Sequence, residues 1–275
     1  MRLATLRLGV RTAAVRVEGD SAVDLGMPDV GALLAMPDWR ERARSTPGHR
    51  LGLAGADYAP VIPRPGKILC VGLNYRSHIT EMGRALPQYP TLFAKYPEAL
   101  IGAADDILLP SRSAAMDWEA ELAVVIGDHV RHADEGMAAA AIAGYSVLND
   151  VTARDWQYRS TQWLQGKTFE RTAPFGPVLV TADELDPDSG LELAAELDGE
   201  IVQRASTADL LFKAVDLVCY ISAILPLSPG DVIATGTPGG VGHAHEPPRY
   251  LRDGVRVTTR ITGIGEMTNV ARASS

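Results

Sequence analysis

Cysteine is scarce in this sequence of 275 residues, which contains only Cys70 and Cys219. Two thiols without CxxC spacing exclude a disulfide framework and a cysteine-rich zinc site. Both lie among apolar neighbours, so we expect buried thiols. No apolar run reaches the ~20 residues that a membrane span requires, and arginines interrupt any signal-peptide-like apolar region at the N-terminus. These absences predict a cytoplasmic protein without a membrane partner.

Basic residues are also fewer than acidic residues. The formal net charge is −8, and no block of lysines or arginines is present. An acidic chain gives no electrostatic support for binding nucleic acid, so we expect no nucleic-acid partner. The remaining composition, 46% hydrophobic and 22% charged, is that of an ordinary globular protein. The length is sufficient for one large domain with a small appendage.

The hydrophobic pattern predicts many strands and few helices. Residues 1–62 contain short alternating runs typical of strands, and the proline-rich stretch 59–67 reads as a connection to the remainder. We therefore expect a small N-terminal β-rich module over 1–62 and a larger catalytic domain over 63–275. Because helices do not regularly separate the strands, an α+β fold is favoured over a doubly wound sheet.

Three local patterns sharpen this expectation. Residues 207–225 carry the longest helical periodicity. A hairpin is predicted around Asp198-Gly199. A short helical segment begins near Asn74, whose side chain is suited to cap it, and ends at Gly83. The glycines and prolines that follow predict a loop.

The stretch MDWEAELAVVIG, residues 116–127, places two carboxylates in an apolar run. On a strand, side chains alternate, so Glu119 and Glu121 share one face while Trp118 and the even-numbered residues after it occupy the other. Asp150 ends another apolar strand, in YSVLND. Three converging carboxylates would form an oxygen-rich site suited to Mg²⁺, Mn²⁺ or Ca²⁺. The alternative is an ordinary solvated strand face.

Two further patterns are candidates for proton transfer and anion binding. His78 and Glu81 have i, i+3 spacing on the short helical segment, which places a carboxylate beside a prospective general base; the alternative is a surface pair. Lys95 and Lys167 stand among aromatic and apolar residues and could stabilise an enolate; the alternative is that both are surface lysines.

The glycine-rich stretch ATGTPGGVG, residues 234–242, lacks the features of a nucleotide-binding loop. Its backbone N–H groups and the Thr237 hydroxyl could bind a carboxylate, or the stretch could simply form a tight turn. The adjoining GHAHEPP is predicted to be a loop and not a metal site.

Five ordered motifs make the sequence similar to a known family. They are ILCVGLNYRSHITEM, DWEAELAVVIG, YSVLNDVTARDWQ, QGKTFERTAPFGP and GDVIATGTPGGVG. In this order they resemble the fumarylacetoacetate hydrolase family over residues 64–271, in particular its acylpyruvase and hydroxyheptadienedioate isomerase branch. The resemblance implies a mixed β-roll or sandwich core and a homodimer.

The resemblance also implies roles for individual residues. It assigns Mg²⁺ or Mn²⁺ to Glu119, Glu121 and Asp150, and places a His78–Glu81 dyad on a lid that orders when ligand binds. Catalytic and substrate contacts fall on the following residues: Lys95, Gln157, Lys167 and Thr237. Specificity would come from lid residues such as Arg84, Leu86, Tyr89 and Phe93. The longer tyrosine-degradation members carry an extra aspartate near the lid histidine; this sequence has no clear counterpart, although Asn74 lies nearby.

The function predicted from these features is metal-dependent hydrolysis of a C–C bond in a β-diketo acid, such as an acylpyruvate or fumarylpyruvate, through a metal-bound enolate. One alternative keeps the site and changes the chemistry, to decarboxylation of an oxaloacetate-type 2-oxo acid or isomerisation of a 2-hydroxydienoate. A second alternative is a catalytically silent binding protein on the same scaffold.

Overall fold

The computed structural model describes residues 1–274 and is built around two packed sheets. The larger is mixed, with strand order β4-β3-β2-β1-β13-β11-β10-β16-β5-β6, and β7 pairs with β13. Its strands are β1 (Arg2–Leu8), β2 (Arg11–Glu18), β3 (Ser21–Asp24), β4 (Arg50–Gly52), β5 (Ile68–Gly72), β6 (Thr91–Lys95), β7 (Leu100–Ile101), β10 (Ala120–Ile126), β11 (Ile142–Asn149), β13 (Ala173–Thr181) and β16 (Val232–Ala234).

The smaller sheet has five strands in the order β15-β14-β17-β18-β8. They are β8 (Ile107–Leu109), β14 (Glu192–Leu197), β15 (Glu200–Ser206), β17 (Arg256–Ile261) and β18 (Gly265–Ala273), and a separate short pair joins β9 (Met116–Asp117) to β12 (Thr152–Ala153). The predicted hairpin is confirmed, because β14 and β15 pair around Asp198 and Gly199. Mixed sheets with few helices confirm the α+β fold.

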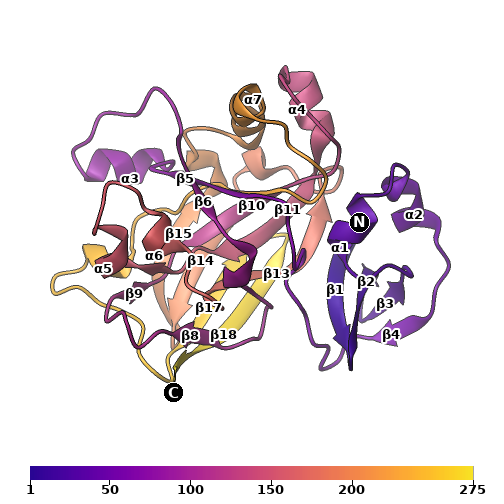
Figure 1. The fold of residues 1–275 in the computed structure, drawn as a ribbon, viewed down its shortest axis with the longest axis horizontal. Coiled ribbons are helices and arrows are strands. Elements are labelled where there is room, and N and C mark those ends of the chain that lie inside the picture. The colour runs from indigo at the N-terminus through magenta and orange to yellow at the C-terminus, as the bar shows by residue number, and fades with distance from the viewer. Residues whose placement is uncertain (275) are drawn as a thin grey trace.

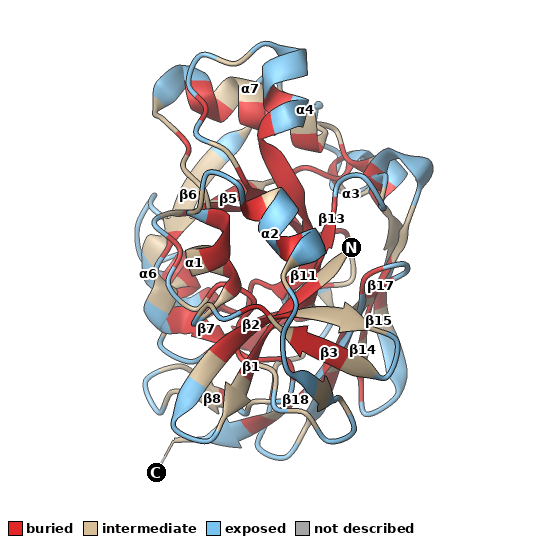
Figure 2. Ribbon diagram, turned by 90° about the vertical axis from the view of Figure 1, so that its right-hand side faces the viewer, coloured by how far each residue is buried: buried red, intermediate tan, exposed pale blue. Residues whose placement is uncertain are grey.

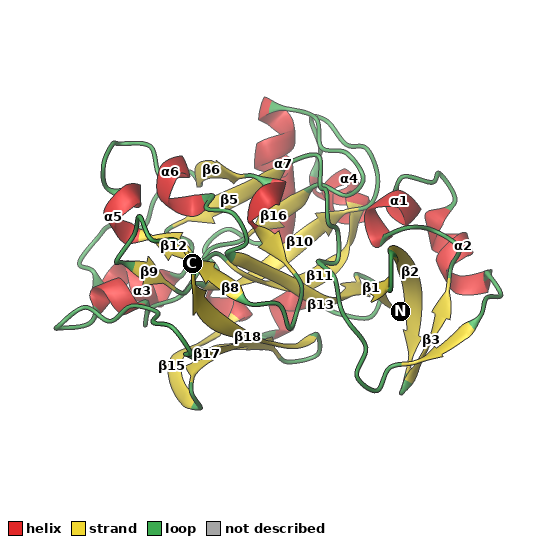
Figure 3. Cartoon of the chain, turned by 60° about the horizontal axis from the view of Figure 1, so that its bottom comes forward, coloured by secondary structure: helices red, strands yellow, loops and turns green. Residues whose placement is uncertain are grey.

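Helices lie around the sheets and do not alternate with the strands (Figure 3). They are α1 (Val30–Leu34), α2 (Trp39–Ser45), α3 (Arg76–Glu81), α4 (Glu135–Ala141), α5 (Arg154–Gln157), α6 (Leu164–Lys167) and α7 (Ala214–Ile224). The longest predicted helix is confirmed as α7, although it is shorter than its periodic pattern. No helix among residues 1–274 is long and apolar enough to cross a membrane.

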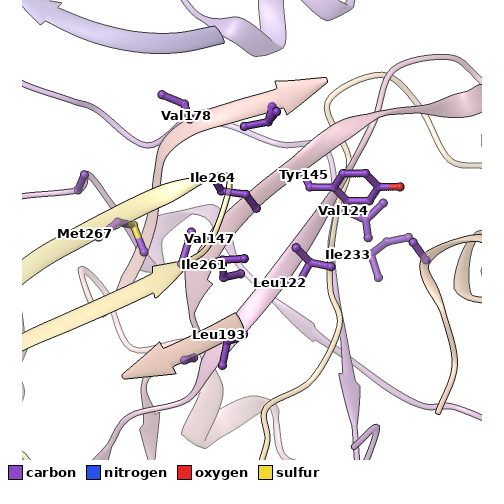
Figure 4. Packing of buried hydrophobic residues seen from close by; sticks show 14 of the residues in the cluster. Leu122, Val124, Tyr145, Val147, Val178, Leu193, Ile233, Ile261, Ile264 and Met267 are labelled. Atoms are coloured by element: carbon purple, nitrogen blue, oxygen red, sulfur yellow. The ribbon is translucent and has the colours of Figure 1, made fainter. Parts of the chain in front are cut away.

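The core shows why β10 can carry charged residues at one end. Leu122 and Val124 point between the two sheets, where they join side chains such as Leu193 and Ile261 (Figure 4). Ala123 and Val125 point to the opposite side, into a second apolar cluster. Every residue of β10 is buried, as is every residue of the neighbouring strand β11 (Figure 2). Because successive residues of β10 belong to different apolar clusters, the alternation predicted from the sequence is confirmed.

Residues 1–62 form β1–β4, α1 and α2, which gather to one side of the larger part of the chain (Figure 1). They are nevertheless joined to it by hydrogen bonds, since Leu3 of β1 pairs with Leu179 of β13. The large sheet therefore runs continuously through both parts, and the division at residue 62 stays a prediction.

The prediction that Asn74 caps the short helix was wrong. Tyr75 occupies the cap position without a side-chain hydrogen bond. The Asn74 carboxamide instead donates to the carbonyls of Phe212 and Thr235 and accepts from the Phe212 N–H. Long-range backbone partners thus compete successfully with the local cap. Cys70 is buried as expected, whereas Cys219 is partly exposed.

Candidate metal centre and active-site cavity

Three acidic side chains converge at the ends of β10 and β11. Glu119, Glu121 and Asp150 each place one carboxylate oxygen within 4.8 Å of the others, and all three residues are buried. The local backbone is fixed by side chains: Asn149 Oδ1 accepts from the Glu119 N–H at 2.9 Å, and Glu121 Oε2 accepts from the Gly236 N–H at 2.8 Å. The carboxylates therefore converge on a preformed site and do not form a solvated strand face.

Two lysines approach the same carboxylates. Lys167 Nζ lies 2.6 Å from Glu119 Oε2 and 2.8 Å from Asp150 Oδ2. Lys95 Nζ lies 2.9 Å from Asp150 Oδ1 and also contacts the Lys167 carbonyl oxygen. Both lysines are almost completely buried, so the surface-lysine alternative was wrong. Their charges offset much of the repulsion among the three carboxylates.

Arg154 is the important site residue that the sequence reasoning missed. It is 5% exposed and makes ion pairs with Glu119 at 2.7 Å and with Asp117 at 2.8 Å. Its Nη2 atom is buried, lacks a hydrogen-bond partner among the described residues, and belongs to a side chain that lines the cavity. The available signal was a charged residue four positions after Asp150 in an otherwise amphipathic stretch.

The buried charges perturb one another strongly. Desolvation, followed by repulsion from Asp150 and Glu119, raises the pKa of Glu121 well above its ordinary value. Burial would also raise the pKa of Asp150, but the positive charges of Lys167 and Lys95 outweigh burial and lower it. Burial opposes the charged form of Lys167, yet Asp150 and Glu119 raise its pKa overall. The metal-free site thus favours a proton on Glu121 and the charged forms of Asp150 and Lys167.

Two members of the triad, Glu119 and Glu121, line a cavity of about 240 Å³, smaller than the 300–1,000 Å³ typical of pockets for drug-sized ligands. Lys167 and His78 line the same cavity. Desolvation, only partly opposed by Glu81, lowers the pKa of His78. A neutral imidazole is therefore available at neutral pH, as a general base requires.

Glu81 is exposed, and no ion pair within 4.0 Å joins it to His78 among residues 1–274. The two side chains nevertheless approach a common point. A Cβ atom built on Gly239 would lie 3.2 Å from His78 Nδ1 and 3.4 Å from Glu81 Oε2. The structure thus brings the two side chains to the same turn without joining them in a hydrogen-bonded dyad.

The remaining predicted contacts have structural partners already. Gln157 is buried, lines the cavity and accepts a hydrogen bond from Arg154 through Oε1. Thr237 also lines the cavity, but its hydroxyl donates to the Ala120 carbonyl at 3.0 Å. Of the predicted specificity residues, Arg84 and Phe93 line this cavity, whereas Tyr89 lies in a separate groove beside Tyr220.

The chain belongs to the fumarylacetoacetate hydrolase family, since the family model for the C-terminal region of fumarylacetoacetate hydrolase matches residues 67–272. The resemblance seen in the five motifs is thereby confirmed. Members of the family include proteins with different named activities, so membership alone defines an enzyme class and not a reaction.

Three relatives illustrate that range. The chain is 43% identical over 213 residues to human oxaloacetate tautomerase FAHD2A, mitochondrial, covering 77% of this chain and 68% of the human protein. Two crystal structures match over the full length of both chains. One is 5-carboxymethyl-2-hydroxymuconate delta-isomerase from Mycobacterium smegmatis, with 34% identity and a TM-score of 0.83. The other is maleylpyruvate hydrolase from Sphingobium sp. SYK-6 in complex with manganese(II) and pyruvate, with 27% identity and a TM-score of 0.82.

The donor set fits a hard divalent cation. Mg²⁺ and Mn²⁺ favour carboxylate oxygens, and the three converging oxygens leave further coordination positions for water or substrate. Apart from this triad, no other group of three or more metal-ligating side chains converges among the described residues. The same ligand set suits either ion.

Proposed function

We propose that this protein is a divalent-metal-dependent enzyme that forms and protonates the enolate of a small 2-oxo acid, with keto–enol tautomerisation of an oxaloacetate-type acid as its principal reaction. The observation that carries this proposal is one small cavity lined by Glu119 and Glu121 of the buried triad, by the lysine against Glu119 and by a histidine whose pKa is lowered. The identity to oxaloacetate tautomerases supports the choice of reaction.

Each residue has a distinct role in this proposal. Glu119, Glu121 and Asp150 would hold Mg²⁺ or Mn²⁺, which supplies Lewis acidity when bound. His78 removes a proton from the carbon next to the 2-oxo group and returns a proton to the enolate oxygen. The positive charges of Lys167 and of the Arg154 guanidinium, which both line the cavity, stabilise the negative charge that develops on that oxygen.

Hydrolysis of acylpyruvates, the reaction predicted from the sequence, is the second candidate. His78 would then remove a proton from water, which attacks the distal carbonyl and cleaves the C–C bond to release a pyruvate enolate. The named hydrolase among the structural neighbours supports this alternative. Decarboxylation of oxaloacetate needs the same enolate stabilisation but no attacking water.

A substrate panel separates these candidates. Oxaloacetate, acylpyruvates and 2-hydroxydienoates are assayed with Mg²⁺, with Mn²⁺ and with EDTA, following enol absorbance and pyruvate release. We expect rapid equilibration of oxaloacetate tautomers and its loss in EDTA. Faster acylpyruvate cleavage than tautomerisation would favour the hydrolase, and metal-independent turnover would contradict the proposed mechanism. A wild-type protein that binds no metal and turns over no substrate would favour the silent binding protein.

The homodimer stays a prediction from the family resemblance, and sedimentation analysis can test it. The cytoplasmic location also stays a prediction, and the human relative is named as mitochondrial.

A further inference from the structure

The turn Thr237–Gly239 lies directly against the His78–Glu81 pair. Any side chain on Gly239 would begin 3.2 Å from His78 Nδ1 and 3.4 Å from Glu81 Oε2. Gly239 does not have a positive φ angle, so its backbone conformation does not demand glycine. The requirement for a small residue therefore comes from the close approach of the two side chains.

Gln203 fixes this turn to the metal-ligand strand. Its Nε2 donates to Thr237 Oγ1 at 2.9 Å and to the Pro238 carbonyl at 3.1 Å. Its Oε1 accepts from the Ala120 N–H at 2.9 Å. Ala120 stands between Glu119 and Glu121, so a single buried carboxamide connects the turn to the backbone that carries two carboxylates of the triad.

The Thr237 hydroxyl completes the connection. It accepts from Gln203 and donates to the Ala120 carbonyl, so both backbone polar groups of Ala120 are used in the link. Gln203 comes from β15 of the smaller sheet, whereas the triad lies at the ends of strands in the larger one. The packing of the two sheets thereby sets the distance between the turn and the carboxylates.

We infer that Gln203 and the turn Thr237–Gly239 form a seat that places the His78–Glu81 pair relative to the metal ligands. Gln203 and Gly239 are positioning residues in this arrangement. The inference deepens the proposed function, on which it rests for the role of His78. Helix α3 has Ile79 as its single buried residue, whereas the turn is held by hydrogen bonds from Gln203 and to Ala120, so a methyl group on Gly239 displaces α3 before it displaces the turn.

The direct test is Gly239→Ala, with Gly52→Ala as the matched control because a Cβ atom on Gly52 meets nothing within 4 Å. Misplacing a catalytic group by about 1 Å can cost on the order of 100-fold in rate. For Gly239→Ala we expect kcat to fall about tenfold or more, with KM and the Mg²⁺ Kd within about twofold of wild type. The control should leave all three unchanged.

A second readout does not depend on turnover. The imidazole NMR signals of His78, assigned by their loss in His78→Ala, should shift in Gly239→Ala and remain in place in Gly52→Ala. Gln203→Glu, which retains an acceptor for the Ala120 N–H, should also shift them. Unshifted His78 signals together with wild-type kcat in Gly239→Ala would overturn the inference.

A double variant distinguishes positioning from general damage. If Gly239 acts through His78, adding Gly239→Ala to His78→Ala should change the residual rate by less than about twofold. If the rate losses of the two single variants instead multiplied in the double variant, Gly239 would not act through His78 and the inference would be contradicted. Failure of the proposed function is recognised separately, as absence of metal-dependent turnover in the wild type, while the NMR comparison still reports on the contact.

Discussion

The acidic floor of the site, formed by Glu119, Glu121 and Asp150, and the segment that carries His78 are held in place in opposite ways. The floor carboxylates project from the ends of buried strands and are held by lysines, an arginine and backbone donors. His78 and Glu81 lie on a six-residue helix followed by a largely exposed loop. Buried like charges require many fixed partners to be tolerated, whereas a group that meets an incoming substrate requires an accessible position.

This contrast indicates that metal binding and proton transfer are separable in the molecule. Substitutions in the floor should change metal affinity and stability together. Substitutions in residues 76–90 should change turnover and leave the floor intact.

Removing a floor carboxylate should have the largest effect. Glu119→Ala or Glu121→Ala should lower Mg²⁺ affinity by at least about 100-fold and abolish detectable turnover, because the site loses a ligand. In calorimetry, wild type at a Mg²⁺ concentration 100 times Kd gains about 2.7 kcal/mol, which raises Tm by several degrees. The variants should lose this increase. A wild-type melting curve that is indifferent to metal would contradict the triad assignment.

Removing the imidazole of His78 should lower turnover without changing the metal affinity of the floor. His78→Ala should reduce kcat by about 10²- to 10⁴-fold, the usual contribution of a general base. Titration calorimetry should show Mg²⁺ affinity within about twofold of wild type. Glu81→Gln should have a smaller effect on kcat, because Glu81 is exposed and not hydrogen-bonded to His78. A large loss of metal affinity in His78→Ala would break the separation between floor and helix.

Lys167→Met tests whether the floor also stabilises the enolate. We expect kcat to fall about 10²- to 10³-fold, since a preformed positive group beside the developing charge is lost. The metal-free protein should also be less stable, because two buried carboxylates lose their partner. Thermal melts with and without Mg²⁺ check this, and added Mg²⁺ should restore more stability than in wild type. An undiminished kcat would remove Lys167 from the mechanism.

The pH dependence of the stability of the metal-free protein should be the smallest of these effects. The raised pKa of Glu121 means that its protonated form stabilises the metal-free fold below its ordinary pKa of about 4.3 and that this contribution is lost as pH rises through the folded-state pKa. The lowered pKa of Asp150 has the opposite sign, so its contribution is lost on acidification below its ordinary pKa of about 3.9.

Denaturant titrations of the metal-free protein between about pH 5 and pH 8 measure this difference. Wild type should lose stability over that interval relative to Glu121→Gln, which cannot ionise. Mg²⁺ should bind more weakly at the acidic end, because it must displace the proton from Glu121. Equal pH dependence in the two proteins would show that Glu121 does not carry the proton.

Much of the site could be predicted from sequence because its strongest signals are local. A strand has a side-chain period of two, so Glu119 and Glu121 had to share a face once the apolar run was taken as a strand. The order of the five motifs then linked these residues to Asp150, His78 and Lys167. The same local reasoning failed at Asn74, where backbone groups of Phe212 and Thr235, distant in sequence, replaced the helix cap.

By itself, then, the sequence determined the strand pattern, the shared face of the two glutamates, the α+β class and the family. Only the tertiary structure decided that Arg154 pairs with Glu119 and that Lys167 contacts both Glu119 and Asp150. The same holds for Gln203, which joins the turn Thr237–Gly239 to Ala120. The physical reason is range. Periodicity fixes which way a side chain points within one element, whereas contacts between elements depend on how two sheets pack and on which buried charges find partners there.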